Sequence, residues 1–397
     1  MSLVAVSEQA WLPYGRQTIT PADEQAVLEC LRGDFLTQGP AVPAFEAALA
    51  AACQAPHAVA FNSATSALHA ACLALGLGPG DRLWTSPISF VASANCGLYC
   101  GARVEFVDID PATALISLPS LQQRLQQAER EGTLPKVLVP VHLVGTSCPM
   151  AELAALADRY GFRILEDASH AVGASYAGVP VGSGHHSAIT VFSFHPVKII
   201  TTGEGGAALS RDPVLVQRLQ RLRSHGISRD AFEEASPGPW YYEQQELGFN
   251  YRLTDLQASL GLSQLQRLSE IVDRRQELMA RYRQLVQGWP LRFLEEPANC
   301  RSSYHLAVVT IPDATPQQHR ALFEGMRAAQ IGVQLHYWPI PLQPHYRRLG
   351  FQPGDFPMAE RYANTSFSLP LFPGMTDADQ DRVLATLGAL LKQQGLA

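Results

Sequence analysis

The alternation of short apolar runs with helical patterns between residues 58 and 165 constrains the fold of this chain more than any other feature. The apolar runs have the length of strands and lie at residues 58–61, 83–86, 104–108, 137–143 and 162–165. Helical spacing of apolar residues occupies the intervals, around residues 68–76, 90–97, 118–128 and 150–160. This order is typical of a mostly parallel sheet with crossover helices, whose ligands bind beyond the carboxyl ends of the strands. We therefore predict an α/β fold with its site at that edge.

The rest of the chain predicts a second, smaller domain. With 397 residues, 47% of them hydrophobic, the chain exceeds the ~250–300 residues at which single cores stop growing. A long amphipathic helix links the domains, with apolar positions at Leu256, Leu260, Leu265, Leu268, Ile271 and Val272. Beyond it come strand candidates at 304–311 and 332–336 and helices around 316–329 and 377–394. We predict a large domain at residues 1–264 and a C-terminal α+β domain at residues 265–397.

Charge and cysteine usage exclude several classes of protein. The net charge of −6 and the lack of a basic run argue against nucleic acid or an anionic membrane as a partner. The seven cysteines form no CxxC pair, which indicates free thiols in a reducing compartment and no metal site. The N-terminus has no basic segment before an apolar core, and no uncharged run is long enough to span a membrane. We expect a cytoplasmic protein.

Lysine is rare in this chain, and one lysine stands in a distinctive place. Only Lys136, Lys198 and Lys392 occur among 30 basic residues. Lys198 lies in VFSFHPVKIITTGEGG (191–206), between an apolar run and a glycine-rich turn. A primary amine can form a Schiff base there, whereas a guanidinium cannot. The alternative is an ordinary loop lysine beside a hairpin turn.

Two further segments have both a functional and a structural interpretation. Asp167 follows the apolar run at 162–165, where its carboxylate could pair with the protonated ring nitrogen of a heteroaromatic cofactor or cap a helix. Taken alone, His170 fits a hydrogen-bonded core histidine. The hydroxyl-rich helix start at residues 62–66 could bind a phosphate or merely cap the helix. The residues alone do not decide between these uses.

Taken together and in this order, the motifs resemble the sugar aminotransferases that use pyridoxal phosphate (PLP), of the DegT/DnrJ/EryC/StrS type. The resemblance covers nearly the whole chain and rests on FNSATSAL (61–68), PISFVASAN (87–95), SFHPVK (193–198) and GEGG (203–206). It implies the PLP-dependent aminotransferase fold type I. LTQG (36–39) and HYWPI (336–340) resemble the branch that makes UDP-4-amino sugars for pseudaminic acid.

The resemblance implies a role for each matched position. Lys198 would be the Schiff-base lysine and proton carrier, and Asp167 the partner of the pyridinium nitrogen. Phe90 would stack on the ring and His170 would lie near its 3-hydroxyl. The phosphate would be held by Thr65, Ser66 and Ser193, and by Asn250 from the partner subunit of a homodimer. The nucleotide-sugar contacts would be Tyr14, Asp34, Phe35, Leu36, Thr37, Ala64, His336, Tyr337, Trp338 and Pro339, with Arg252 for a carboxylate or diphosphate.

The implied reaction moves the amino group of L-glutamate to C4 of a UDP-linked 4-keto-6-deoxy sugar, UDP-2-acetamido-2,6-dideoxy-β-L-arabino-hex-4-ulose. Sister enzymes of the legionaminic acid, bacillosamine and perosamine pathways share most of these strings, so the substrate epimer stays open.

Three other classes of protein are alternatives. A short-chain sugar dehydratase or epimerase would need the motifs GxGxxG and YxxxK, and neither occurs here, since the positions four before the lysines are Gly132, Phe194 and Gly388. A PLP-dependent dehydrase would carry histidine in place of Lys198. A non-catalytic binding protein of the same fold would have no need of Lys198.

Overall fold

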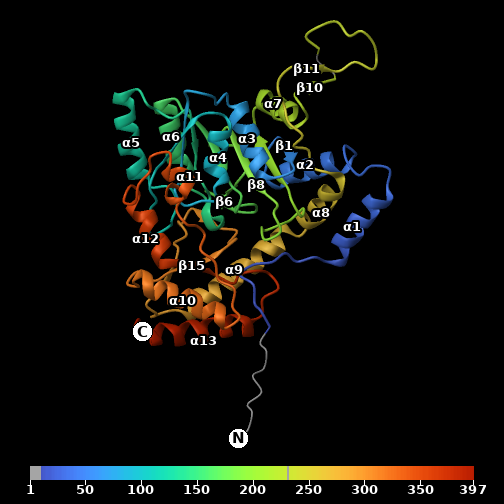
Figure 1. Ribbon diagram of the computed structural model, residues 1–397. Coiled ribbons are helices and arrows are strands. Elements are labelled where there is room, and N and C mark those ends of the chain that lie inside the picture. The colour runs from blue at the N-terminus through green and yellow to red at the C-terminus, as the bar shows by residue number, and fades with distance from the viewer. Residues whose placement is uncertain (1–9, 230–231) are drawn as a thin grey trace.

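The computed structural model describes residues 10–229 and 232–397, and its centre is a seven-stranded sheet (Figure 1). The strand order is β1-β9-β8-β5-β4-β2-β3. The bounds are β1 (His57–Phe61), β2 (Arg82–Thr85), β3 (Arg103–Phe106), β4 (Val137–Val139), β5 (Arg163–Asp167), β8 (Ile189–Ser193) and β9 (Gly206–Ser210). Neighbours from β3 to β8 pair in parallel, and β9 pairs antiparallel with both β8 and β1. The prediction of a mostly parallel sheet is confirmed.

Helices cover both faces of this sheet. They are α2 (Ala41–Ala52), α3 (Ala64–Ala74), α4 (Ala92–Tyr99), α5 (Leu118–Glu131), α6 (Met150–Tyr160), α7 (Pro213–Arg223) and α8 (Asp255–Leu265). The helix α1 (Pro21–Arg32) packs on the outside of α8. Successive side chains of a strand point to opposite faces. Accordingly Val191 of β8 packs in the core that contains α3 and α4, whereas Phe192 packs in the core that contains α2 and α8.

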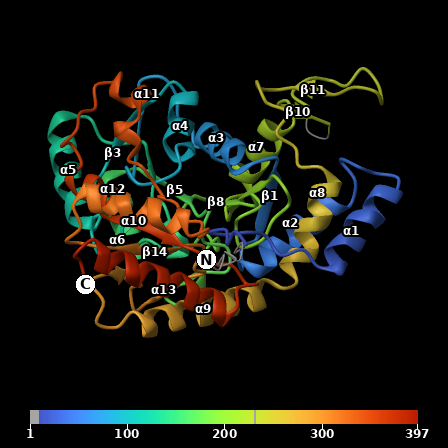
Figure 2. The same ribbon diagram turned by 60° about the horizontal axis from the view of Figure 1, so that its bottom comes forward.

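The C-terminal part builds a third core around a small antiparallel sheet. This sheet has the order β12 (Arg292–Phe293), β14 (Ala307–Thr310) and β15 (Ser366–Leu369). Its helices are α9 (Leu268–Leu285), α10 (Pro316–Ala328) and α13 (Asp377–Gln393), and α9 and α13 lie side by side in both ribbon views (Figure 2). Between α10 and α13 come α11 (Pro344–Arg347) and α12 (Pro357–Thr365), whose Tyr346 and Tyr362 pack in the core of the large sheet. Leu12 also packs in this core, so the N-terminal segment returns to the C-terminal part. The boundary after residue 264 stays a prediction.

Two 3₁₀ helices, at Leu143–Gly145 and Ile340–Leu342, and further two-residue strands complete the described elements. These strands are β6 (Ser175–Tyr176), β7 (Val179–Pro180), β10 (Ile227–Ser228), β11 (Glu243–Gln244) and β13 (Cys300–Arg301). All seven cysteines are free thiols. In the described part of the chain, no helix combines the length and the apolar character that crossing a membrane requires. Residues 1–9, on which the expectation about targeting partly rests, lie outside the described residues.

Two predicted elements differ from the structure. The long linking helix is two helices, α8 and α9, because Arg267 leaves helical geometry (φ −105°, ψ 13°) and donates to buried Asp23 of α1. The predicted strand at 332–336 is a single bridge between Gln334 and Ser368. There, Gly332 donates to Leu12 and approaches the backbone so closely that a Cβ would lie 2.9 Å from the nitrogen of Tyr14. Contacts with the N-terminal segment therefore replace sheet pairing.

Candidate active site

The predicted site residues gather at the carboxyl edge of the large sheet. β5 ends at Asp167 and β8 at Ser193, and these strands are parallel neighbours. Lys198 follows β8 in the connection to β9, which closes on itself because Phe194 donates to Gly205 (2.9 Å) and accepts from Thr202 (3.0 Å). The connection thus belongs to a β-hairpin with a long loop, and Lys198 lies within that loop.

Asp167 is buried and accepts two hydrogen bonds. Ser93 of α4 donates its hydroxyl to Oδ2 (2.5 Å), and the backbone N–H of Ser169 donates to Oδ1 (3.1 Å). Ser93 in turn lies 2.6 Å from the hydroxyl of Ser89. The residues after Asp167 form a turn and no helix, so its carboxylate is not a helix cap. The carboxylate is therefore fixed at the end of the strand.

The amino group of Lys198 lies close to a histidine that the sequence motifs do not include. Nζ is 3.5 Å from Nε2 of His305. Burial lowers the pKa of Lys198 to about 8, and the negative charge of Asp167 opposes that shift. At neutral pH, a lysine with this pKa exchanges its proton more readily than an exposed lysine does.

Three buried histidines and a tyrosine surround Lys198. The rings of His170 and His305 are 4.4 Å apart, and Nε2 of His170 lies 3.2 Å from the hydroxyl of Tyr337. Nδ1 of His336 lies 2.8 Å from the hydroxyl of Ser368. Burial and the charge of Lys198 lower the pKa of all three histidines, that of His336 to about 3. They are neutral at physiological pH, so their rings can accept hydrogen bonds without repelling a cation.

A second group of residues meets at the start of α3. Ser63 caps this helix by accepting from the N–H of Ser66 (3.1 Å), and the hydroxyl of Ser66 donates to the side chain of Asn62 (2.7 Å). Gly206 of β9 abuts the helix so closely that a Cβ would lie 2.4 Å from the nitrogen of Ala64. Since Gly206 pairs with Ser193 in the sheet, Ser193 lies beside the same helix end. The first-turn N–H groups, Thr65 and Ser193 can together bind an anion.

Several predicted sugar contacts join the histidine group, and others do not. The rings of Tyr14 and His336 are 5.1 Å apart, and those of Phe90 and Tyr337 are 6.3 Å apart. Trp338 is exposed and Pro339 is buried. By contrast, the segment 34–37 lies at the start of α8, where the carbonyl of Leu36 accepts from Asp255 (2.9 Å).

Asn250 and Arg252 are the remaining predicted residues. The carbonyl of Asn250 accepts from the side chain of Asn62 (3.4 Å), which places its backbone near the start of α3 in the same chain. The side chain of Asn250 is exposed, and Arg252 is half-buried. Sequence reasoning missed Ser93 and His305. Ser93 lies on the helix predicted around residues 90–97, and the string PISFVASAN contains it, whereas nothing in the local pattern identified His305.

The chain matches a family of known enzymes over most of its length. The model of the DegT/DnrJ/EryC1/StrS aminotransferase family matches residues 17–388. The chain belongs to this family. A relative, the spore coat polysaccharide biosynthesis protein SpsC of Bacillus subtilis, is 37% identical and the match covers 96% of this chain and 97% of that protein.

Solved sugar aminotransferases of similar fold extend the match. The putative sugar aminotransferase Spr1654 of Streptococcus pneumoniae in its PLP form has a TM-score of 0.89 at 28% identity, and the match covers 97% of this chain and 99% of that one. PseC of Helicobacter pylori, an aminotransferase involved in the biosynthesis of pseudoaminic acid, has a TM-score of 0.89 at 29% identity, with 96% and 100% covered. This member of the family therefore has the PLP-dependent aminotransferase fold and uses PLP.

The residues present fit that cofactor. PLP carries a phosphate, a ring nitrogen and an aldehyde, and the edge of the sheet offers an anion site at α3, a buried carboxylate at Asp167 and the amine of Lys198. The buried Nδ1 of His170 has no partner within the described residues, which leaves a polar atom for a ligand.

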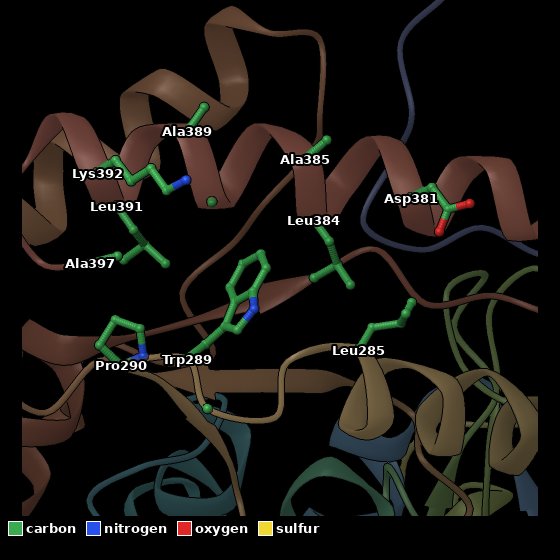
Figure 3. Close-up of a pocket in the computed structure, with 12 residues that line it drawn as sticks. Leu285, Trp289, Pro290, Asp381, Leu384, Ala385, Ala389, Leu391, Lys392 and Ala397 are labelled. Carbon is green, nitrogen blue, oxygen red and sulfur yellow. The ribbon is translucent and has the colours of Figure 1, made fainter.

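A cavity in the C-terminal part of the described chain lacks these groups. This cavity of about 740 Å³ lies between the end of α9 and α13, where Trp289 faces Leu384 and Leu391 (Figure 3). Its charged lining residues are Asp381 and Lys392, and it contains none of the predicted site residues. Among the described residues, no group of three or more His, Cys, Asp or Glu side chains is arranged to hold a metal ion.

Proposed function

We propose that this family member transfers the amino group of L-glutamate to C4 of a UDP-linked 4-keto-6-deoxy-N-acetylhexosamine, the L-arabino epimer, and so supplies a UDP-4-amino sugar for pseudaminic acid. The observation that carries the proposal is the amine of Lys198, which lies among neutral histidines beside the buried carboxylate of Asp167. The likeness to PseC and the strings LTQG and HYWPI support the choice of substrate.

Each group has a defined task in this proposal. Bound PLP draws electrons away from the carbon that carries the amine, which makes the hydrogen on that carbon acidic. Lys198 would take that proton from Cα of the amino donor with Nζ and return it to the C4′ carbon of the cofactor, and would move a proton in the reverse direction when the sugar is aminated. Asp167 accepts a hydrogen bond from the ring nitrogen and keeps it protonated, while Ser93 and Ser169 hold the carboxylate in position.

The remaining proposed contacts bind and orient. Thr65, Ser66 and Ser193 hold the phosphate at the start of α3, Asn250 reaches it from the partner subunit, and Phe90 covers the ring. Tyr14, His336 and Tyr337 lie together and contact the sugar. In the proposed homodimer, the segment 34–37, which lies at the start of α8, would reach the sugar bound to the neighbouring subunit.

The visible spectrum of the protein loaded with PLP tests this proposal. L-glutamate is expected to bleach the yellow absorbance, and the L-arabino 4-keto epimer is expected to restore it. Lys198→Ala is expected to bind PLP without these changes and to lose turnover by at least about 10⁴-fold, because it lacks the group that moves the proton. The exposed Lys136→Ala, which loses an ion pair with Asp81 and a hydrogen bond to the carbonyl of Gly76, is the control.

The other outcomes distinguish the alternatives. Restoration by the D-xylo epimer alone would keep the aminotransferase and move it to a sister pathway. Turnover that survives Lys198→Ala would remove the central assignment. A protein that never develops the yellow absorbance would instead be a binding protein of the same fold.

A further inference from the structure

His305 is held in place by contacts of its backbone. Its N–H donates to the carbonyl of Val144 (2.8 Å), and its carbonyl accepts from the guanidinium of Arg275 (3.3 Å). Arg275 is fully buried on α9 and donates also to the carbonyls of Tyr304 and Leu371, both at 3.1 Å. Because these contacts join three separate segments, the backbone of His305 cannot move without disturbing the core between them.

The ring of His305 has one polar contact. Nε2 lies 3.5 Å from Nζ of Lys198, while Nδ1 is buried without a hydrogen-bond partner within the described residues. The ring of His170 packs against it, with 4.4 Å between the centroids. Within the described residues, the buried ring of His305 therefore makes a hydrogen bond only while its Nε2 stays next to Nζ of Lys198.

The charges around Lys198 and His305 determine whether Nζ or Nε2 donates the hydrogen bond between them. Asp167 on β5 faces Lys198. His170, from the segment 168–174, and His336, from the segment 332–339, also lie near the amine of Lys198. Arg275 on α9 faces His305. Burial, followed by the positive charges of Lys198 and Arg275, lowers the pKa of His305 well below its usual value. The imidazole is therefore neutral, and with its proton on Nδ1 it presents a lone pair on Nε2 to the ammonium.

We propose that His305 is a positioning residue for Lys198: its Nε2 accepts a hydrogen bond from the lysine ammonium and holds Nζ in place at the end of β5. A lysine side chain has four rotatable bonds, so a fixed acceptor removes much of the freedom of its amino group. The inference rests on the proposed role of Lys198 as the lysine that moves the proton. It adds a residue from the C-terminal half of the chain to a site otherwise built mainly on the large sheet.

The titration of Lys198 in the protein freed of PLP tests this inference. Because the chain has three lysines, the rate of acetylation by trace acetic anhydride can be followed for each lysine by mass spectrometry as a function of pH. Lys136 and Lys392 serve as internal references. A neutral acceptor stabilises the ammonium more than the amine, so His305→Leu is expected to lower the midpoint of Lys198 by about one pH unit.

Two variants separate the hydrogen bond from a general structural role. His305→Gln places an amide oxygen within reach of Nζ and is expected to return the midpoint to within about 0.3 of the wild-type value. The exposed His185→Leu is expected to leave it unchanged. In the loaded enzyme, His305→Leu is expected to lower kcat about tenfold with KM for glutamate unchanged, and His305→Gln to recover most of that loss.

The results also keep this inference apart from the proposed function. An unchanged midpoint in His305→Leu, or a midpoint that drops equally in His305→Gln, would overturn the role of His305 and leave the transamination untouched. If His305→Leu does not fold, the midpoint of His305→Gln decides, since a shift of a full unit there contradicts the inference. Turnover that persists in Lys198→Ala would overturn the proposed function, whatever His305 does.

Discussion

At the scale of single residues, the site depends on Asp167, a buried carboxylate that accepts hydrogen bonds from Ser93 and Ser169. Asp167→Asn keeps the size of the side chain but removes the charge that pairs with a ring nitrogen. We expect the glutamate half-reaction to slow by at least about 100-fold and PLP to dissociate more readily. The loss of this charge should also move the pKa of Lys198 below about 8, because Asp167 stabilises the ammonium.

Stopped-flow absorbance and the acetylation midpoint of Lys198 measure the two effects. The exposed Asp158→Asn on α6 is the matched control. An Asp167→Asn enzyme with wild-type rates would mean that the carboxylate does not face the ring nitrogen.

At the scale of elements, the junction of α1, α8 and α9 is fastened by one buried carboxylate. Asp23 is fully buried and accepts from Ser263 (2.7 Å), Gln264 (2.8 Å) and Arg267 (2.7 Å). Burial would raise the pKa of Asp23, but hydrogen bonds from Ser263 and Thr20 and the charge of Arg267 hold it below its usual value. We expect Asp23→Ala to lower the free energy of unfolding by about 3 kcal/mol, since it takes their shared acceptor from the buried Ser263 and Gln264 and from the half-buried Arg267.

Urea denaturation with Asp23→Ala, and with the exposed Glu24→Ala of the same helix as control, measures this effect. The pH dependence provides a second check. Because the folded pKa is depressed, the stabilisation is present above the unfolded pKa near 4 and is lost as the pH falls below it. A difference between Asp23→Ala and the wild type that persisted undiminished at the lowest pH at which both still fold would contradict the assignment.

At the scale of the whole molecule, exposed apolar side chains gather around α1. Leu31 is 54% exposed, Phe35 55% and Leu36 46%, a surface that a second copy of the chain can cover. If Asn250 completes the site of the partner subunit, then Lys198→Ala and Asn250→Ala chains, each expected to be inactive alone, should form a mixed dimer with one intact site. Coexpression with two affinity tags should give about half the wild-type activity.

The oligomeric state of the purified mixture, from light scattering, is measured beside its activity. A mixed dimer without activity would place Asn250 in the site of its own chain. A monomer would remove the shared site altogether.

The sequence by itself determined the large sheet and the places of Lys198 and Asp167. Apolar periodicity reports which side of an element is buried, and the residue after a buried strand lies at the edge of the sheet whatever the rest of the chain does. Asp167 was found in this way, whereas Lys198 was found by the rarity of lysine and by its place between an apolar run and a glycine-rich turn. The family resemblance supplied their roles.

Tertiary structure alone decided which side chains contact them. Ser93 and Asp167 are 74 residues apart in the sequence, and Lys198 and His305 are 107 apart, so no local pattern records either contact. The break between α8 and α9 has the same origin, because Asp23 binds Arg267 across 244 residues. Burial sets the pKa of Lys198, and burial arises only when the segments that carry the three histidines close around its amino group.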